Sequence, residues 1–119
     1  VPKVGFVTVP KSYTDIAGKQ VDADDMDVCV RVISVFKCHK ASPLTSASAI
    51  SVAAALKGSV VEKVLRPMNC VNTVRLGHPS GIMTMVPDLR DENGKIELPS
   101  VGVQRTARRI MDGTLYIRR

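Results

Sequence analysis

Small hydroxyl side chains gather where an apolar segment begins, in SPLTSASAISVAAALKG at residues 42–58. Pro43 and these hydroxyls are typical of a helix start, alanine dominates the body, and Gly58 is a typical stop. Apart from the hydroxyls and Lys57 the segment is apolar or small on every face, so we expect a central helix buried all round.

The first N–H groups of this helix need hydrogen-bond acceptors, and the sequence leaves two sources open. One source is the set of hydroxyl side chains beside them, which are Ser42, Thr45, Ser46 and Ser48. The other is a bound carboxylate, because a helix N-terminus attracts anions.

A second polar motif, LGHPSGIMTM at residues 76–85, places His78 and Ser80 between two β-prone runs. Such a stretch predicts a hairpin connection, and Gly77 and Gly81 let the backbone turn closely past a ligand. Ser80 can then offer its hydroxyl or N–H to a carboxylate. His78 either adds positive charge beside a polyanion or hydrogen-bonds the loop.

The three cysteines are Cys29, Cys38 and Cys70, an odd number without metal-ligand spacing. This pattern argues against a zinc site or a disulfide framework and favours a reducing compartment. Cys38 precedes His39, and it is either an activated thiol or an inert apolar filler. We expect no metal, no cofactor, no membrane segment, no signal peptide and a cytoplasmic location.

The net charge is +6, and much of the excess lies in RTARRIMDGTLYIRR at residues 105–119. A nucleic-acid-binding surface normally combines basic residues with aromatic stacking groups, and only Tyr116 accompanies these arginines. We therefore expect no nucleic-acid partner. The segment is read as a solvated edge strand or as a surface that pairs with an acidic domain.

Hydrophobic patterning places these motifs on an α+β fold. Strands are predicted at 4–9, 70–76, 82–86, 96–103, 105–111 and 114–118, with turns at Asn93–Gly94 and Asp112–Gly113. Helices are predicted at 25–36, 42–58 and, briefly, 60–66. The 25–36 helix would bury Val28, Cys29, Val32, Ile33 and Phe36. We expect one domain, 1–119, in which a curved, mostly antiparallel, barrel-like sheet wraps around the central apolar helix.

Three stretches in order, HKASPLTSASAISVAAALKGSVV, RLGHPSGIMTM and RTARRIMDGTLYI, resemble the C-terminal half of the PrpF family of methylaconitate and methylitaconate isomerases. The resemblance implies a diaminopimelate-epimerase-like fold of two similar halves, with substrate between their helix N-termini. It also implies that the catalytic Lys and Cys lie in the other half, so no catalytic residue is assigned here. Related epimerases carry a catalytic Cys where this chain has Ser46, and a serine is a poor proton carrier by comparison.

The resemblance implies the C-terminal domain of a cofactor-independent isomerase that shifts an allylic proton on an unsaturated di- or tricarboxylate. The expected substrate-binding residues are Thr45, Ser46, His78, Ser80 and Gly81. The missing half would belong to the same polypeptide or to a separate chain. The resemblance is also compatible with a homo-oligomer. A start at Val1 without methionine favours a fragment. A stand-alone carboxylate-binding module and a basic nucleic-acid-binding domain are the alternatives.

Overall fold

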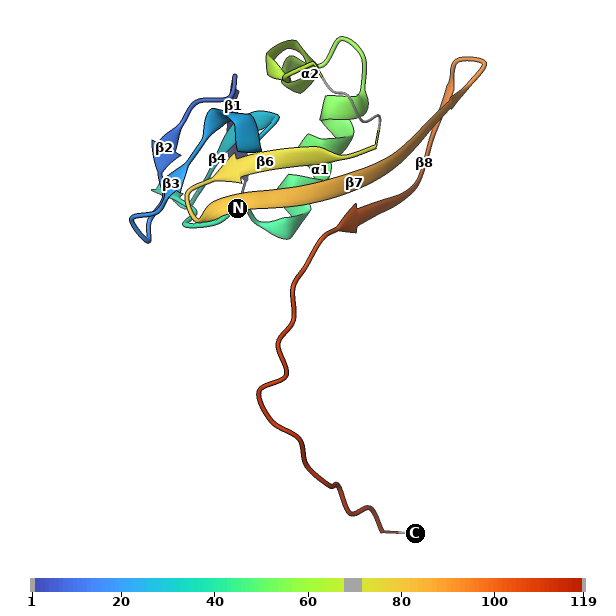
Figure 1. The fold of residues 1–119 in the computed structure, drawn as a ribbon. Helices are drawn as coiled ribbons and strands as arrows, with labels where there is room; N and C mark the ends of the chain where they lie inside the picture. Colours follow the sequence, from blue (N-terminus) through green and yellow to red (C-terminus); the bar gives the residue numbers. More distant parts are fainter. Residues whose placement is uncertain (1, 68–71, 119) are drawn as a thin grey trace.

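The computed structural model describes residues 2–67 and 72–118, and its main element is a curled six-stranded sheet (Figure 1). Its strands are β1 (Lys3–Thr8), β4 (Val28–Ser34), β5 (Lys37–Cys38), β6 (Val74–His78), β7 (Gly81–Glu92) and β8 (Lys95–Val103). Their order is β1-β4-β6-β7-β8, with β5 paired to β4. All pairs are antiparallel except β4 with β6, so the expected mostly antiparallel, half-barrel α+β fold is confirmed.

The sheet curls around α1 (Leu44–Ala55), and a short α2 (Val60–Val64) follows along the chain. A small hairpin of β2 (Tyr13–Thr14) and β3 (Gln20–Val21) and a 3-10 turn (Ala23–Asp25) precede β4. Within residues 2–67 and 72–118, no helix has the length and apolar character needed to cross a membrane.

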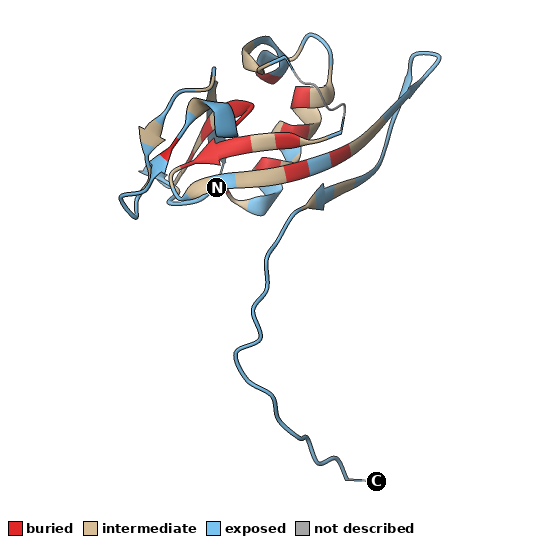
Figure 2. Ribbon diagram, in the orientation of Figure 1, coloured by how far each residue is buried: buried red, intermediate tan, exposed pale blue. Residues whose placement is uncertain are grey.

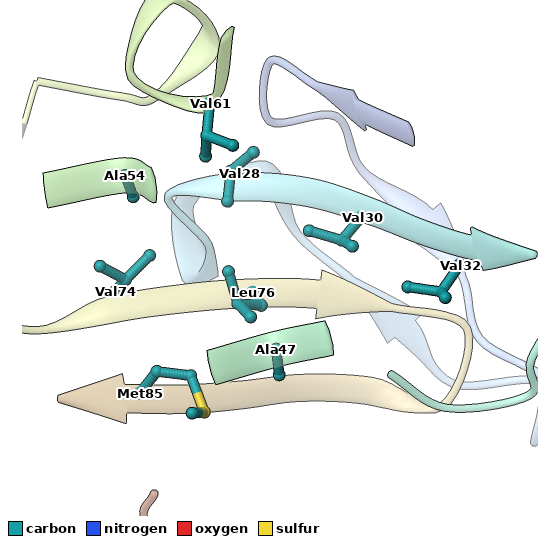
Figure 3. Close-up of a cluster of buried hydrophobic side chains, with 9 residues drawn as sticks. All are labelled: Val28, Val30, Val32, Ala47, Ala54, Val61, Val74, Leu76 and Met85. Atoms are coloured by element: carbon teal, nitrogen blue, oxygen red, sulfur yellow. The ribbon is translucent and has the colours of Figure 1, made fainter. Parts of the chain in front are cut away.

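The core lies between α1 and the concave face of the sheet (Figures 2 and 3). It contains Val28, Val30, Val32, Ala47, Ala54, Val61, Val74, Leu76 and Met85. The prediction that the helix is buried all round is wrong for this chain. Only Ala47, Ser51 and Ala54 are buried, at helical spacing on one side, whereas Leu44 is 42% exposed. The half-barrel covers one side of α1 and leaves the other accessible.

The predicted helix at 25–36 is wrong, because most of this segment forms β4. Val28, Val30 and Val32 are buried and alternate with less buried residues, which is the period of two that a strand requires. Valine occurs so often here that a helical set of apolar positions could be found by chance. β-branching, which favours strands, was the better guide.

The predicted hairpin at the C-terminal end is also wrong. Residues 104–118 form no regular secondary structure and run away from the sheet (Figure 1). Ile110, Met111 and Tyr116 are 87%, 83% and 92% exposed. Asp-Gly is a good turn signal, but a two-stranded hairpin without a neighbouring strand or helix is at best marginally stable. Predictions for the Asn93–Gly94 turn, the β6–β7 hairpin and α2 are confirmed, while residues 70–71 of a predicted strand lie outside the described residues.

The turn between β4 and β5 carries backbone strain. Val35 and Phe36 have φ angles of 50° and 60°, and Phe36 is 100% exposed. Two-residue hairpin turns of this conformation prefer Asn-Gly, because side chains with bulk at Cβ are disfavoured in the left-handed region. The turn at Asn93–Gly94 has the preferred pair, with φ angles of 55° and 82°.

Replacing Val35 and Phe36 together by Asn and Gly is therefore expected to raise the free energy of unfolding by about 1–2 kcal/mol. Urea unfolding of the chain measures the change. The matched control reverses the exchange, with Val and Phe in place of Asn93 and Gly94, and is expected to lower stability by a similar amount. Equal stability of all three chains would show that valine and phenylalanine adopt this turn conformation without strain.

Candidate functional site

The first turn of α1 has no side-chain cap. Pro43 is the N-cap residue and provides no capping hydrogen bond. The first helical bond is made by the N–H of Ala47, which donates to the carbonyl of Pro43 at 2.8 Å. Within the described part of the chain, the N–H groups of Leu44, Thr45 and Ser46 have no acceptor.

The hydroxyls that could have capped this turn do other things. Ser48 Oγ donates to the carbonyl of Leu44 at 2.9 Å, inside the helix, and Ser42 Oγ makes no hydrogen bond to the described residues. Self-capping by the hydroxyls, the first of the two sources expected for this helix, is therefore wrong. Three N–H donors and the positive end of the helix dipole remain available to an anion.

Two buried polar atoms just before α1 also lack partners among the described residues. Ser42 is 5% exposed, and its Oγ has no hydrogen bond. The Nε2 atom of His39 is also buried and has no hydrogen bond. Buried polar atoms are rarely left unpaired, so each is a candidate to bind a group that the described residues do not provide. From the sequence alone, Ser42 is predicted only as a cap and His39 is only a neighbour of Cys38. Their adjacency to the helix start in HKAS was the signal available.

The β6–β7 connection is a two-residue turn, because His78 pairs with Gly81 across Pro79 and Ser80. The N–H of Ser80 donates to Nδ1 of His78 at 3.2 Å, and Ser80 Oγ donates to the carbonyl of Lys40. Both donors predicted to bind a carboxylate are thus engaged within the protein. The Lys40 contact joins the turn to the segment that leads into α1.

His78 is buried, with 6% exposure. Burial, and secondarily the positive charge of Arg31, lowers the pKa of His78 below its ordinary value of 6.5. The side chain is therefore neutral near pH 7, and the bond from Ser80 to Nδ1 assigns its proton to Nε2. Of the two roles left open for His78, this geometry favours hydrogen bonding within the loop.

The predicted site residues fall into two groups at one end of the sheet. In Figure 3, Ala47 lies beside Leu76 and Met85 and Ala54 beside Val74, so α1 begins toward the end of β6 that leads into the turn. Thr45 and Ser46 belong to that first turn. Ser80 and Gly81 line a hollow of 290 Å³ that Thr45 and Ser46 do not line. This hollow lies against the β2–β3 hairpin.

The protein is an α+β half-barrel built around one helix whose first turn is uncapped. Comparisons with known proteins identify its family. The chain matches the PrpF protein family over residues 1–118. It is 37% identical over 117 residues to the 3-methylitaconate isomerase of Eubacterium barkeri, covering 98% of this chain and 30% of that protein. It is 39% identical over 116 residues to the 2-methyl-aconitate isomerase of Shewanella oneidensis, covering 98% and 29%.

A crystal structure of methylitaconate-delta-isomerase matches this structure with a TM-score of 0.75 and 36% sequence identity. The match covers 94% of this chain and 28% of that chain. The chain therefore belongs to the PrpF family. It spans less than one third of the length of these relatives.

Proposed function

We propose that this chain is the carboxylate-binding part of a longer isomerase that acts on an unsaturated di- or tricarboxylate. Relatives named as 3-methylitaconate and 2-methyl-aconitate isomerases support this substrate class. The observation that carries the proposal is the uncapped first turn of α1, which offers the N–H groups of Leu44, Thr45 and Ser46.

A substrate carboxylate at this turn would accept hydrogen bonds from the three N–H groups and lie at the positive end of the helix dipole. Thr45 and Ser46 have hydroxyls in the same turn. Ser42 Oγ and His39 Nε2, which lack partners in the described residues, are further candidates to complete the site. A polycarboxylate needs donors from more than one direction, and these two side chains are the proposed source of the second set, because both donors of Ser80 are engaged within the protein.

The reaction moves a proton along an allylic system. When the proton leaves the carbon next to a carboxylate, negative charge spreads onto that carboxylate, and fixed donors stabilise the developing charge. In this proposal the chain supplies these donors. The remainder of the enzyme supplies the acid and base that remove and return the proton, so the reaction proceeds without a cofactor or metal.

The proposal predicts that the 119-residue chain alone does not isomerise methylitaconate or methylaconitate, because donors without an acid and a base cannot transfer the proton. NMR spectra of the substrate, incubated with homogeneous chain of verified intact mass, measure turnover. A longer polypeptide that includes this chain and the remaining family segment is expected to be active. Turnover by the chain alone would show that the acid and base lie within these residues.

The competing function is a carboxylate-binding module without catalysis, completed or not by a partner. The intact mass of the native protein and the length of its gene discriminate between the two. A gene that encodes only these residues, in a cell that provides no complementing chain, would favour the module.

A further inference from the structure

The β6–β7 turn is held from outside by a segment far away in the sequence. Tyr13 Oη lies 2.6 Å from the carbonyl oxygen of His78 and 2.9 Å from that of Gly81, the two residues that flank the turn. The N–H of Ile16 donates to the carbonyl of Pro79 at 2.8 Å. The β2–β3 hairpin therefore holds the turn at three of its carbonyl groups.

Tyr13 is itself fixed in place. The guanidinium of Arg31 lies 4.7 Å from the centre of the Tyr13 ring, a distance at which a cation–π attraction operates. Nη1 of Arg31 also donates to the carbonyls of Val30 at 2.7 Å and Gly77 at 3.2 Å. Because the β4–β6 pairing ends at Cys29 and Gly77, Arg31 bridges the two strands where they separate.

The packing around Gly77 confirms how closely the hairpin approaches the turn. A Cβ atom at Gly77 would lie 3.4 Å from Tyr13 Oη and 2.5 Å from Sδ of the buried Met26. Burial raises the pKa of Tyr13 above its ordinary value of 10.0, so the phenol remains a donor at neutral pH.

The β6–β7 hairpin does not need Tyr13 in order to form. The pairing of β6 and β7 runs without interruption from Val74 with Met85 to His78 with Gly81. What the phenol adds is a fixed location for the end of the hairpin relative to the rest of the sheet. That location decides whether Ser80 reaches the carbonyl of Lys40, in the segment that leads into α1.

We infer that Tyr13 is a positioning residue for the carboxylate site. It holds the β6–β7 turn, and Ser80 in this turn contacts Lys40 in the segment that leads into α1. This inference rests on the proposed function. Without the phenol, the turn can shift, and the Lys40–Pro43 segment that carries Ser42 loses its contact with the turn.

The test is Tyr13→Phe, which removes only the hydroxyl, with Tyr116→Phe in the exposed tail as the matched control. Hydrogen exchange of the Ser80 amide is measured first, since this amide donates to His78 only while the turn is in place. Loss of one hydrogen bond is expected to speed its exchange about 2- to 10-fold, with core amides such as that of Val30 unchanged. Unchanged exchange at Ser80 would overturn the inference.

The second measurement is the Kd of the chain for methylitaconate, expected to rise by a similar factor in Tyr13→Phe while the urea unfolding midpoint stays nearly constant. Faster exchange without a change in Kd would also overturn the inference, since the turn would then be irrelevant to binding. If the wild-type chain binds no methylitaconate, the proposed function fails, and the exchange result alone decides whether Tyr13 holds the turn.

Discussion

Replacing Asp27 by Ala is expected to lower the free energy of unfolding by about 3 kcal/mol, a large part of the total stability of a domain of this size. Asp27 is buried and accepts hydrogen bonds from the backbone N–H, Nε and Nη2 of Arg75 at 2.8, 3.2 and 2.8 Å. Its own N–H donates to the carbonyl of Arg75 at 2.9 Å, and its carbonyl accepts from Arg66 at 2.9 Å.

These bonds set the register between the first residues of β4 and β6, the one parallel pair among the described strands of the sheet. The side chain of Arg75 is 38% exposed, so water can solvate part of the charge that the substitution leaves unpaired. This exposure keeps the expected loss at the lower end of the range for buried ion pairs.

The matched control is Asp24→Ala. Asp24 pairs with Arg66 at 3.0 Å, but its side chain is 92% exposed, so its loss is expected to change stability by less than about 1 kcal/mol. Urea unfolding of the two variants measures both changes. Similar losses in the two variants would contradict the structural role assigned to Asp27.

Replacing Thr45 by Asp is expected to move binding and stability in opposite directions. A carboxylate side chain in the first turn of α1 accepts bonds from the free N–H groups and complements the helix dipole, which raises the free energy of unfolding by about 0.5 kcal/mol. The same charge occupies the proposed site and repels a substrate carboxylate. The Kd for methylitaconate is expected to rise at least about tenfold.

The control for Thr45→Asp is Gln104→Glu, which adds one negative charge to an exposed residue beyond the end of β8. Calorimetric titration with methylitaconate and urea unfolding give the two quantities. An unchanged Kd in the Thr45 variant would show that the first turn of α1 does not bind the carboxylate. A Kd that rises equally in the control would show that only net charge matters.

Short-range residue preferences were enough to predict the elements whose conformation agrees with the contacts they make in the fold. The Pro43 start and alanine-rich body of α1 and the Asn93–Gly94 turn follow from short-range preferences. The same reasoning failed at β4, where valine at every second position was read with a helical period. It failed again at Asp112–Gly113, where a good turn pair has no neighbouring element to support the strands.

The candidate site was predictable in part. The hydroxyl-rich helix start and the Ser80 turn were identified from residue types, but their hydrogen bonds depend on contacts between distant segments. Ser80 bonds to Lys40, 40 residues away, and Tyr13 bonds to the turn from a distance of 65 residues. No local preference encodes these contacts. The unpaired atoms of Ser42 and His39 likewise become visible only once burial is known.

NMR titration of the isotope-labelled chain with methylitaconate measures whether the first turn of α1 binds a substrate carboxylate. We expect the largest, saturable shifts at the backbone amides of Leu44, Thr45 and Ser46, with smaller shifts at Ser42 and Ser80. Shifts confined to the arginine-rich residues 105–118, or no saturable shift in the first turn of α1, would contradict this expectation.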